Sequence, residues 1–124
     1  MLDLACGTGE MVCTWARDHQ VTGTGIDIST VFIAAARTRG AELGVDGRVS
    51  FVLGDASGYV AAAPVFITSC IGATWIGGGV PGTVELLRHS LQPGGMKAPA
   101  SQRHTGTYLV TTSGVTFGEN WPAR

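Results

Sequence analysis

The first 95 residues of this chain alternate short apolar runs with amphipathic stretches, and no other feature constrains the fold as much. Apolar runs of the length of buried strands cover 1–5, 23–28, 48–53 and 65–69. Helical periodicity follows from Glu10, over 31–43, and from Pro81 to Leu91. Because helices that separate strands favour parallel pairing, the pattern predicts an α/β fold with a doubly wound, mostly parallel sheet covered on both faces.

The helix expected over 31–43 has clear signals at both of its ends. Ser29 or Thr30 can supply the side-chain oxygen of an N-cap. Gly44 can take the left-handed conformation that ends a helix. The last helix carries Pro81 in its first turn and is expected to stop at Pro93.

Composition limits the classes of protein to which the chain can belong. With 124 residues, 44% of them apolar and 14% charged, it suits one globular domain with a single core. The formal net charge is −1 and no lysine or arginine run is present, so no nucleic-acid partner is expected. Every apolar run is too short or too interrupted by glycine to span a membrane, so no membrane partner is expected either.

The cysteines indicate the compartment. Cys6, Cys13 and Cys70 are odd in number and form no CxxC pair, so free thiols in a reducing cytoplasm are expected. Neither the cysteines nor the three scattered histidines have metal-ligand spacing. The sequence therefore predicts no metal site.

Two glycines, Gly7 and Gly9, follow the first expected strand and precede a helix. Glycines at this point permit a sharp turn and let a ligand approach the backbone, next to the free N–H groups of a helix N-terminus. Many strand-to-helix turns hold two glycines for packing alone. The third glycine of the dinucleotide pattern GxGxxG would fall at Val12, which disfavours a nicotinamide or flavin site.

Acidic residues stand at the ends of three expected strands: Asp3, Asp27 and Asp55. A parallel sheet brings these ends to one edge. Asp27 lies where nucleotide-binding α/β folds place an acid against ribose hydroxyls; the alternative is a helix cap, a role that Ser29 and Thr30 can fill. Asp55 suits an exocyclic amine, with the N–H of Ala56 beside it, or equally a turn after Gly54.

Together, the segments MLDLACGTGE (1–10), GIDIS (25–29), GDA (54–56) and LQPGG (91–95) resemble the class I S-adenosylmethionine-dependent methyltransferases in order and spacing. The segment CIGATWIGGG (70–79) resembles their small-molecule methyltransferase-domain type. The resemblance implies a Rossmann-like fold and S-adenosylmethionine as cofactor. It further implies methyl transfer to a small-molecule acceptor.

The same resemblance implies roles for individual residues. Around the methionine part of the cofactor it places Asp3, Gly7, Gly9, Cys70 and Ile71. Ala5 stands where the family usually has its first glycine, and alanine is a common, small variant there. Asp27, with Ile28 beside it, belongs to the ribose site, and Asp55 and Ala56 belong to the adenine site.

The acceptor site is harder to read from the sequence. Trp75 is a candidate for its wall, because an aromatic face favours a planar or cationic group; the alternative is a tryptophan buried in the core. In-line methyl transfer needs a general base only when the nucleophile must lose a proton. The sequence identifies no catalytic residue, no specific acceptor and no oligomeric state.

The family pattern stops after Gly95. We expect residues 1–95 to form the cofactor-binding core of a fold that is incomplete at both ends. Residues 96–124 are expected to form an atypical tail, either poorly ordered or with a β-hairpin from Tyr108 to Phe117. Such a hairpin would complete the sheet as a compact variant. The alternative functions are an inactive fragment or cofactor-binding remnant and, less favoured, a nicotinamide-dependent oxidoreductase.

Overall fold

The computed structural model describes residues 1–71, 73 and 75–92, and the backbone of 108–111 and 114–117. Strands and helices alternate along most of this length, as the sequence predicts. The elements are β1 (Leu2–Leu4), α1 (Glu10–His19), β2 (Gly23–Asp27), α2 (Thr30–Glu42), β3 (Val49–Leu53), β4 (Ile67–Cys70), α3 (Val80–Ser90), β5 (Tyr108–Thr111) and β6 (Gly114–Phe117). Within the described residues, no helix is long and apolar enough to cross a membrane.

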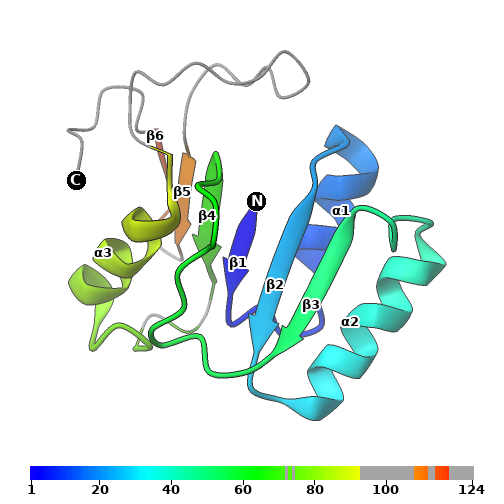
Figure 1. The fold of residues 1–124 in the computed structure, drawn as a ribbon, viewed down its shortest axis with the longest axis horizontal. Coiled ribbons are helices and arrows are strands. Elements are labelled where there is room, and N and C mark those ends of the chain that lie inside the picture. Colours follow the sequence, from blue (N-terminus) through cyan, green and yellow to red (C-terminus); the bar gives the residue numbers. More distant parts are fainter. Residues whose placement is uncertain (72, 74, 93–107, 112–113, 118–124) are drawn as a thin grey trace.

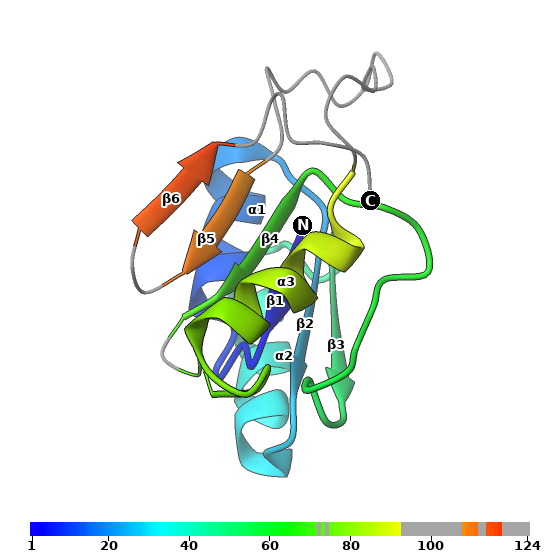
Figure 2. The same ribbon diagram turned by 90° about the vertical axis from the view of Figure 1, so that its left-hand side faces the viewer.

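The strands form one mostly parallel sheet in the order β3-β2-β1-β4-β5-β6. Figure 2 shows them side by side behind α3, with β6 at one edge and β3 at the other. Strand β1 pairs in parallel with β2 on one side and with β4 on the other. The chain therefore winds outward from β1 to β3 and then crosses to the opposite side of β1, which confirms the doubly wound α/β fold.

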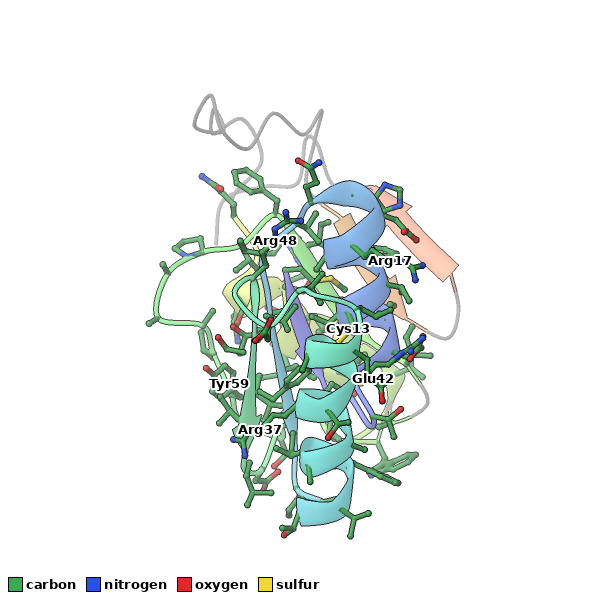
Figure 3. All side chains as sticks on the ribbon, turned by 90° about the vertical axis from the view of Figure 1, so that its right-hand side faces the viewer. Cys13, Arg17, Arg37, Glu42, Arg48 and Tyr59 are labelled. Atoms are coloured by element: carbon green, nitrogen blue, oxygen red, sulfur yellow. The ribbon has the colours of Figure 1, made fainter. Side chains whose placement is uncertain are left out.

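Helices cover both faces of the sheet. In Figure 1, α1 and α2 lie on one face and α3 lies on the other. Alternation along β1 divides its side chains: Leu2 and Leu4 pack in a buried cluster with Leu87 of α3, while Asp3 points to the opposite face. On that face Cys13 lies at the contact of α1 with α2, and Figure 3 shows it between the two helices.

Helix α2 begins and ends where its signals place it. The Ser29 hydroxyl is the N-cap and accepts the N–H of Phe32 at 3.2 Å. Gly44 follows the C-terminal end with φ +69°, and its N–H donates to the carbonyl of Ala41. Arg37, on the side of α2 nearest β3 in Figure 3, donates to the carbonyl of Phe51 at 3.2 Å.

The fourth strand and the last helix differ from their expected boundaries. The strand is Ile67–Cys70, and the helix ends at Ser90, before Leu91 and before the stop expected at Pro93. Leu91 is extended instead and forms a parallel bridge with Val65, whose N–H donates to the carbonyl of Ser90 at 2.9 Å. This conformation keeps Leu91 in the cluster on the α3 side of the sheet, so tertiary packing overrides the helical period at this position.

Beyond Gln92 the structure describes only two strands. Strand β5 pairs in parallel with β4, and β6 pairs antiparallel with β5, with Tyr108 opposite Phe117. The edge of β4 is thereby covered by backbone hydrogen bonds. The rest of the expected tail lies outside the described residues, and the division of the chain at residue 95 stays a proposal.

The glycine loop supplies a stability prediction. Gly9 has φ +71°, and a Cβ added there would lie 2.7 Å from Cε1 of Phe51. Gly44 has nearly the same φ, +69°, with nothing within 4 Å of an added Cβ. Gly44→Ala should therefore cost about 1 kcal/mol from the left-handed backbone alone. Gly9→Ala should cost roughly 1–3 kcal/mol more because the core must shift.

Urea unfolding of both variants beside the wild-type chain measures these costs. Equal losses of unfolding free energy for Gly9→Ala and Gly44→Ala would show that the loop does not pack on Phe51 as the structure has it.

Candidate functional site

The order of the strands places a candidate site at the carboxyl edge of the sheet. The loop after β1 leads into α1 on one face, whereas the loop after β4 leads toward α3 on the other face (Figure 1). Adjacent loops diverge at such a switch in strand order, and open α/β sheets bind their ligands outside the carboxyl ends of the strands at this point, here β1 and β4. Most of the predicted site residues stand at this edge.

The loop after β1 is anchored to β2 by its backbone. The N–H of Cys6 donates to the carbonyl of Ile26 at 2.9 Å, and the N–H of Gly9 turns back to the carbonyl of Cys6 at 3.0 Å. An added Cβ at Gly7 would meet nothing within 4 Å, so the backbone is open on that side. Glycine here leaves room for a ligand against the chain.

Ala5 adopts an unusual backbone conformation. Its φ is 56°, in the left-handed region that favours glycine. From the sequence, alanine is expected to be a common, small variant at the position where the family usually has its first glycine. The structure adds that the cost of this substitution lies in the backbone dihedral rather than in side-chain size.

Asp27 joins the loop after β1 to the start of α2. Its Oδ2 accepts the N–H of Gly7 at 2.9 Å, and its Oδ1 accepts the N–H of Ser29 at 2.9 Å. The helix-cap alternative for Asp27 is wrong, because the Ser29 hydroxyl performs that role. A carboxylate has about four acceptor positions, so each oxygen of this fixed carboxylate can accept a further hydrogen bond.

Asp3 lies inside the sheet beside a residue that the sequence did not indicate. The Ser69 hydroxyl on β4 donates to Oδ1 of Asp3 at 2.7 Å, because the β1–β4 register sets these residues opposite each other. Burial raises the pKa of Asp3 from 3.8 to about 7; the Ser69 bond opposes this rise and the charge of Asp27 adds to it. The one feature of the sequence that could have indicated Ser69 is that a polar residue stands within a strand expected to be buried.

The two thiols at this edge are protonated at neutral pH. Burial, followed by the nearby charge of Asp3, raises the pKa of Cys6 to about 12 and that of Cys70 to about 11. The Cys70 thiol lies 3.5 Å from the carbonyl of Ala73. Since the thiolate is the reactive form, the raised pKa values disfavour both cysteines as nucleophiles.

Asp55 and Ala56 follow the end of β3 and adjoin Asp27. The N–H of Gly54 donates to the carbonyl of Asp27 at 2.9 Å, which ties the two strand ends together. Asp55 is exposed, and its Oδ1 accepts the N–H of Ser57 at 2.9 Å. This bond lowers the pKa of Asp55 and gives the residue the turn role considered above, while its exposed position leaves it open to a ligand.

The apolar candidates differ in exposure. Ile28 is 74% exposed, Trp75 is 72% exposed and Ile71 is partly exposed, whereas Cys70 and Ala56 are buried. Trp75 therefore does not belong to the core, and this alternative for it is wrong. No hydrogen bond or ring contact of the described residues links Trp75 to the acids, so its assignment to an acceptor wall stays a prediction.

A surface hollow of about 350 Å³ lies elsewhere, between α1 and α2. Two carboxylates line it, and Arg39 pairs with both, with Glu10 at 2.9 Å and with Glu42 at 3.3 Å. Exposed pairs of this kind contribute little to stability. The hollow borders the loop after β1 through Thr8 and Glu10, but none of the predicted site residues lines it.

A glycine loop, an acid at the end of the second strand and a switch in strand order beside them are typical of doubly wound α/β domains that bind nucleotide-type cofactors. The family model described as "Methyltransferase domain" matches residues 1–95. The chain therefore belongs to the methyltransferase-domain family, and the resemblance drawn from its motifs is confirmed.

Relatives agree with this membership. The uncharacterized protein YjhP of Escherichia coli (strain K12) is 57% identical over 96 residues, which cover 77% of this chain and 39% of that protein. The solved structure of a SAM-dependent methyltransferase from Geobacter sulfurreducens is 61% identical with a TM-score of 0.73, covering 74% of this chain and 37% of that one.

A SAM-dependent methyltransferase from Thiobacillus denitrificans is 55% identical with a TM-score of 0.73, over the same shares of 74% and 37%. The Geobacter and Thiobacillus proteins were both solved in complex with S-adenosyl-L-homocysteine. This chain thus spans less than two fifths of the length of these relatives.

The strained alanine supplies a second stability prediction. Ala5→Gly should raise the unfolding free energy by about 1 kcal/mol, because relief of the left-handed strain exceeds the added chain entropy. Ala62→Gly is the matched control: Ala62 is exposed and does not have a positive φ, so this change should only lower stability. Urea unfolding decides, and a loss of stability in both variants would contradict the strain at Ala5.

The buried carboxyl makes stability depend on pH. Between pH 4 and 7 the folded state holds a proton on Asp3 that the unfolded state has released, so this group should make unfolding easier as pH rises. The full effect is on the order of 4 kcal/mol. Asp3→Asn should remove this pH dependence. The difference in unfolding free energy between the wild-type and Asp3→Asn proteins isolates the contribution of Asp3, because the other titrating groups are common to both. Urea unfolding from pH 4.5 to 8 tests this, and a pH-independent difference would be contrary to expectation.

Proposed function

We propose that this chain binds S-adenosylmethionine at the carboxyl edge of its sheet and serves methyl transfer to a small-molecule acceptor. One observation carries the proposal: the Asp27 carboxylate is fixed by the N–H groups of Gly7 and Ser29, directly beside the open loop. Membership of the methyltransferase-domain family supports reading this arrangement as a cofactor site rather than a packing motif.

The residues present fit the chemistry of this cofactor. Asp27, held with acceptor positions to spare, suits the two ribose hydroxyls, and the exposed Ile28 lies beside it. Asp55 and Ala56 adjoin this point through Gly54 and suit the adenine amine and ring nitrogen. The methionine part would lie along the loop and the end of β4, against Asp3, Ala5, Gly7, Gly9, Cys70 and Ile71.

The bound cofactor would supply a methyl group on a sulfonium, and the protein contributes by positioning the acceptor in line with it. Trp75, exposed on the loop after β4, offers an aromatic face for that acceptor.

The net charge of −1 favours a small molecule over nucleic acid. All three cysteines are free thiols, which supports the cytoplasm as the compartment.

Two other functions give different results in simple assays. A chain that spans less than two fifths of its relatives could bind the cofactor without turnover. A methyl-transfer screen with radiolabelled S-adenosylmethionine separates binding from catalysis. A nicotinamide enzyme is disfavoured by Val12, which is fully buried where that motif needs glycine, and titration with NAD tests it directly.

The proposal predicts ligand-dependent stability. S-adenosyl-L-homocysteine at 100 times its Kd should add about 2.7 kcal/mol to the unfolding free energy. Asp27→Asn should weaken binding about tenfold or more, because an amide cannot replace both charge-assisted acceptors. Asp46→Asn, on an exposed aspartate away from the site, is the control.

Isothermal titration calorimetry and thermal shift measure both effects. Asp27 also holds the loop, so circular dichroism of the Asp27→Asn protein must first show that it is folded. No stabilisation of the wild-type chain at millimolar ligand, or equal affinity in the two variants, would overturn the proposed function.

A further inference from the structure

A buried hydrogen bond crosses the centre of the sheet where its strand order switches. It joins the Ser69 hydroxyl on β4 to Oδ1 of Asp3 on β1 at 2.7 Å. Asp3 is 4% exposed and Ser69 is not exposed at all. Buried polar groups this close to a predicted ligand site either stabilise the core or fix a group that the ligand needs.

No positively charged group among the described residues acts on Asp3. The groups that interact with it electrostatically are Asp27 on β2, Cys6 in the loop after β1 and Cys70 on β4. Among the described residues, the ion pairs all lie elsewhere, on helices α1, α2 and α3. Within the described part of the chain, the Ser69 hydroxyl is therefore the group that stabilises the ionised form of Asp3.

The second oxygen of Asp3 has a different position. Oδ2 accepts no hydrogen bond from the described residues. Among the described side chains, Thr68 Oγ1 is the one enclosed polar atom without a partner, so Oδ2 of Asp3 must keep some access to the surface. One oxygen of the carboxyl is thus held from within the sheet, and the other accepts no hydrogen bond from the described residues.

We propose that Ser69 is a positioning residue of the cofactor site: its hydroxyl holds Oδ1 of Asp3 so that Oδ2 meets a cationic group of the ligand. This inference rests on the proposed function, in which the group is the α-ammonium of the methionine part. A cation that binds Oδ2 needs the carboxylate ionised, and Ser69 favours that state against burial and the charge of Asp27.

The first experiment reads Asp3 without any ligand. Carboxyl ¹³C NMR gives the titration midpoint of Asp3 in the wild-type chain and in Ser69→Ala. Loss of a hydrogen bond to a charged group should raise the midpoint by about one pH unit or more. Ser69→Thr keeps the hydroxyl and should restore the wild-type midpoint, whereas Ser69→Cys keeps the size and should behave like Ser69→Ala.

The second experiment measures affinity for S-adenosyl-L-homocysteine by calorimetry at two pH values. With midpoints about one unit apart, Ser69→Ala should bind about five- to tenfold more weakly at pH 6.5 and less than about twofold more weakly at pH 8.5. In an Asp3→Asn background the Ser69→Ala change should have no further effect. A merely structural serine would produce a loss that is the same at both pH values.

The outcomes separate the two proposals. An unchanged Asp3 midpoint in folded Ser69→Ala, or a loss of affinity independent of pH and of Asp3, would overturn the role of Ser69. No binding by the wild-type chain would instead overturn the proposed function, while the ligand-free titration would still decide whether Ser69 controls the carboxylate. Urea unfolding and circular dichroism identify any variant that is not folded, and Ser69→Cys then takes its place.

Discussion

The carboxylate of Asp27 is the interaction on which the edge of this sheet depends. It accepts one N–H from the loop after β1 and one from the start of α2, so a single charged group fixes both segments. Hydrogen bonds from backbone N–H groups to an ionised carboxylate are stronger than bonds between two neutral groups. The same carboxylate keeps acceptor positions free for a ligand, which links the stability of the loop to its chemistry.

The carboxyl edge combines features that do not favour stability. Asp3 is buried with no cation beside it among the described residues, and Ala5 holds a left-handed backbone angle. Each arrangement costs free energy that the clusters of apolar side chains on the two faces of the sheet must offset. Local departures of this kind concentrate at functional sites, and in this chain they lie within a few residues of one loop.

The glycine positions and the helix caps could be predicted from the sequence because they rest on neighbours along the chain. Ser29 caps α2 through a residue three positions away, and Gly44 ends it from the next turn. Leu91 was wrongly predicted to be helical, because its conformation depends on a contact with a residue distant along the chain. Its helical spacing was real, but a bridge to Val65 and a place in the core decided its conformation.

By itself, the sequence determined the α/β class, the glycine loop, the acids at the strand ends and the methyltransferase family, since these follow from periodicity and from motifs of adjacent residues. Tertiary structure alone decided that Ser69 lies against Asp3 and that Trp75 is outside the core. The reason is physical: strand order and register bring together residues 66 positions apart, and local preferences carry no information about such contacts.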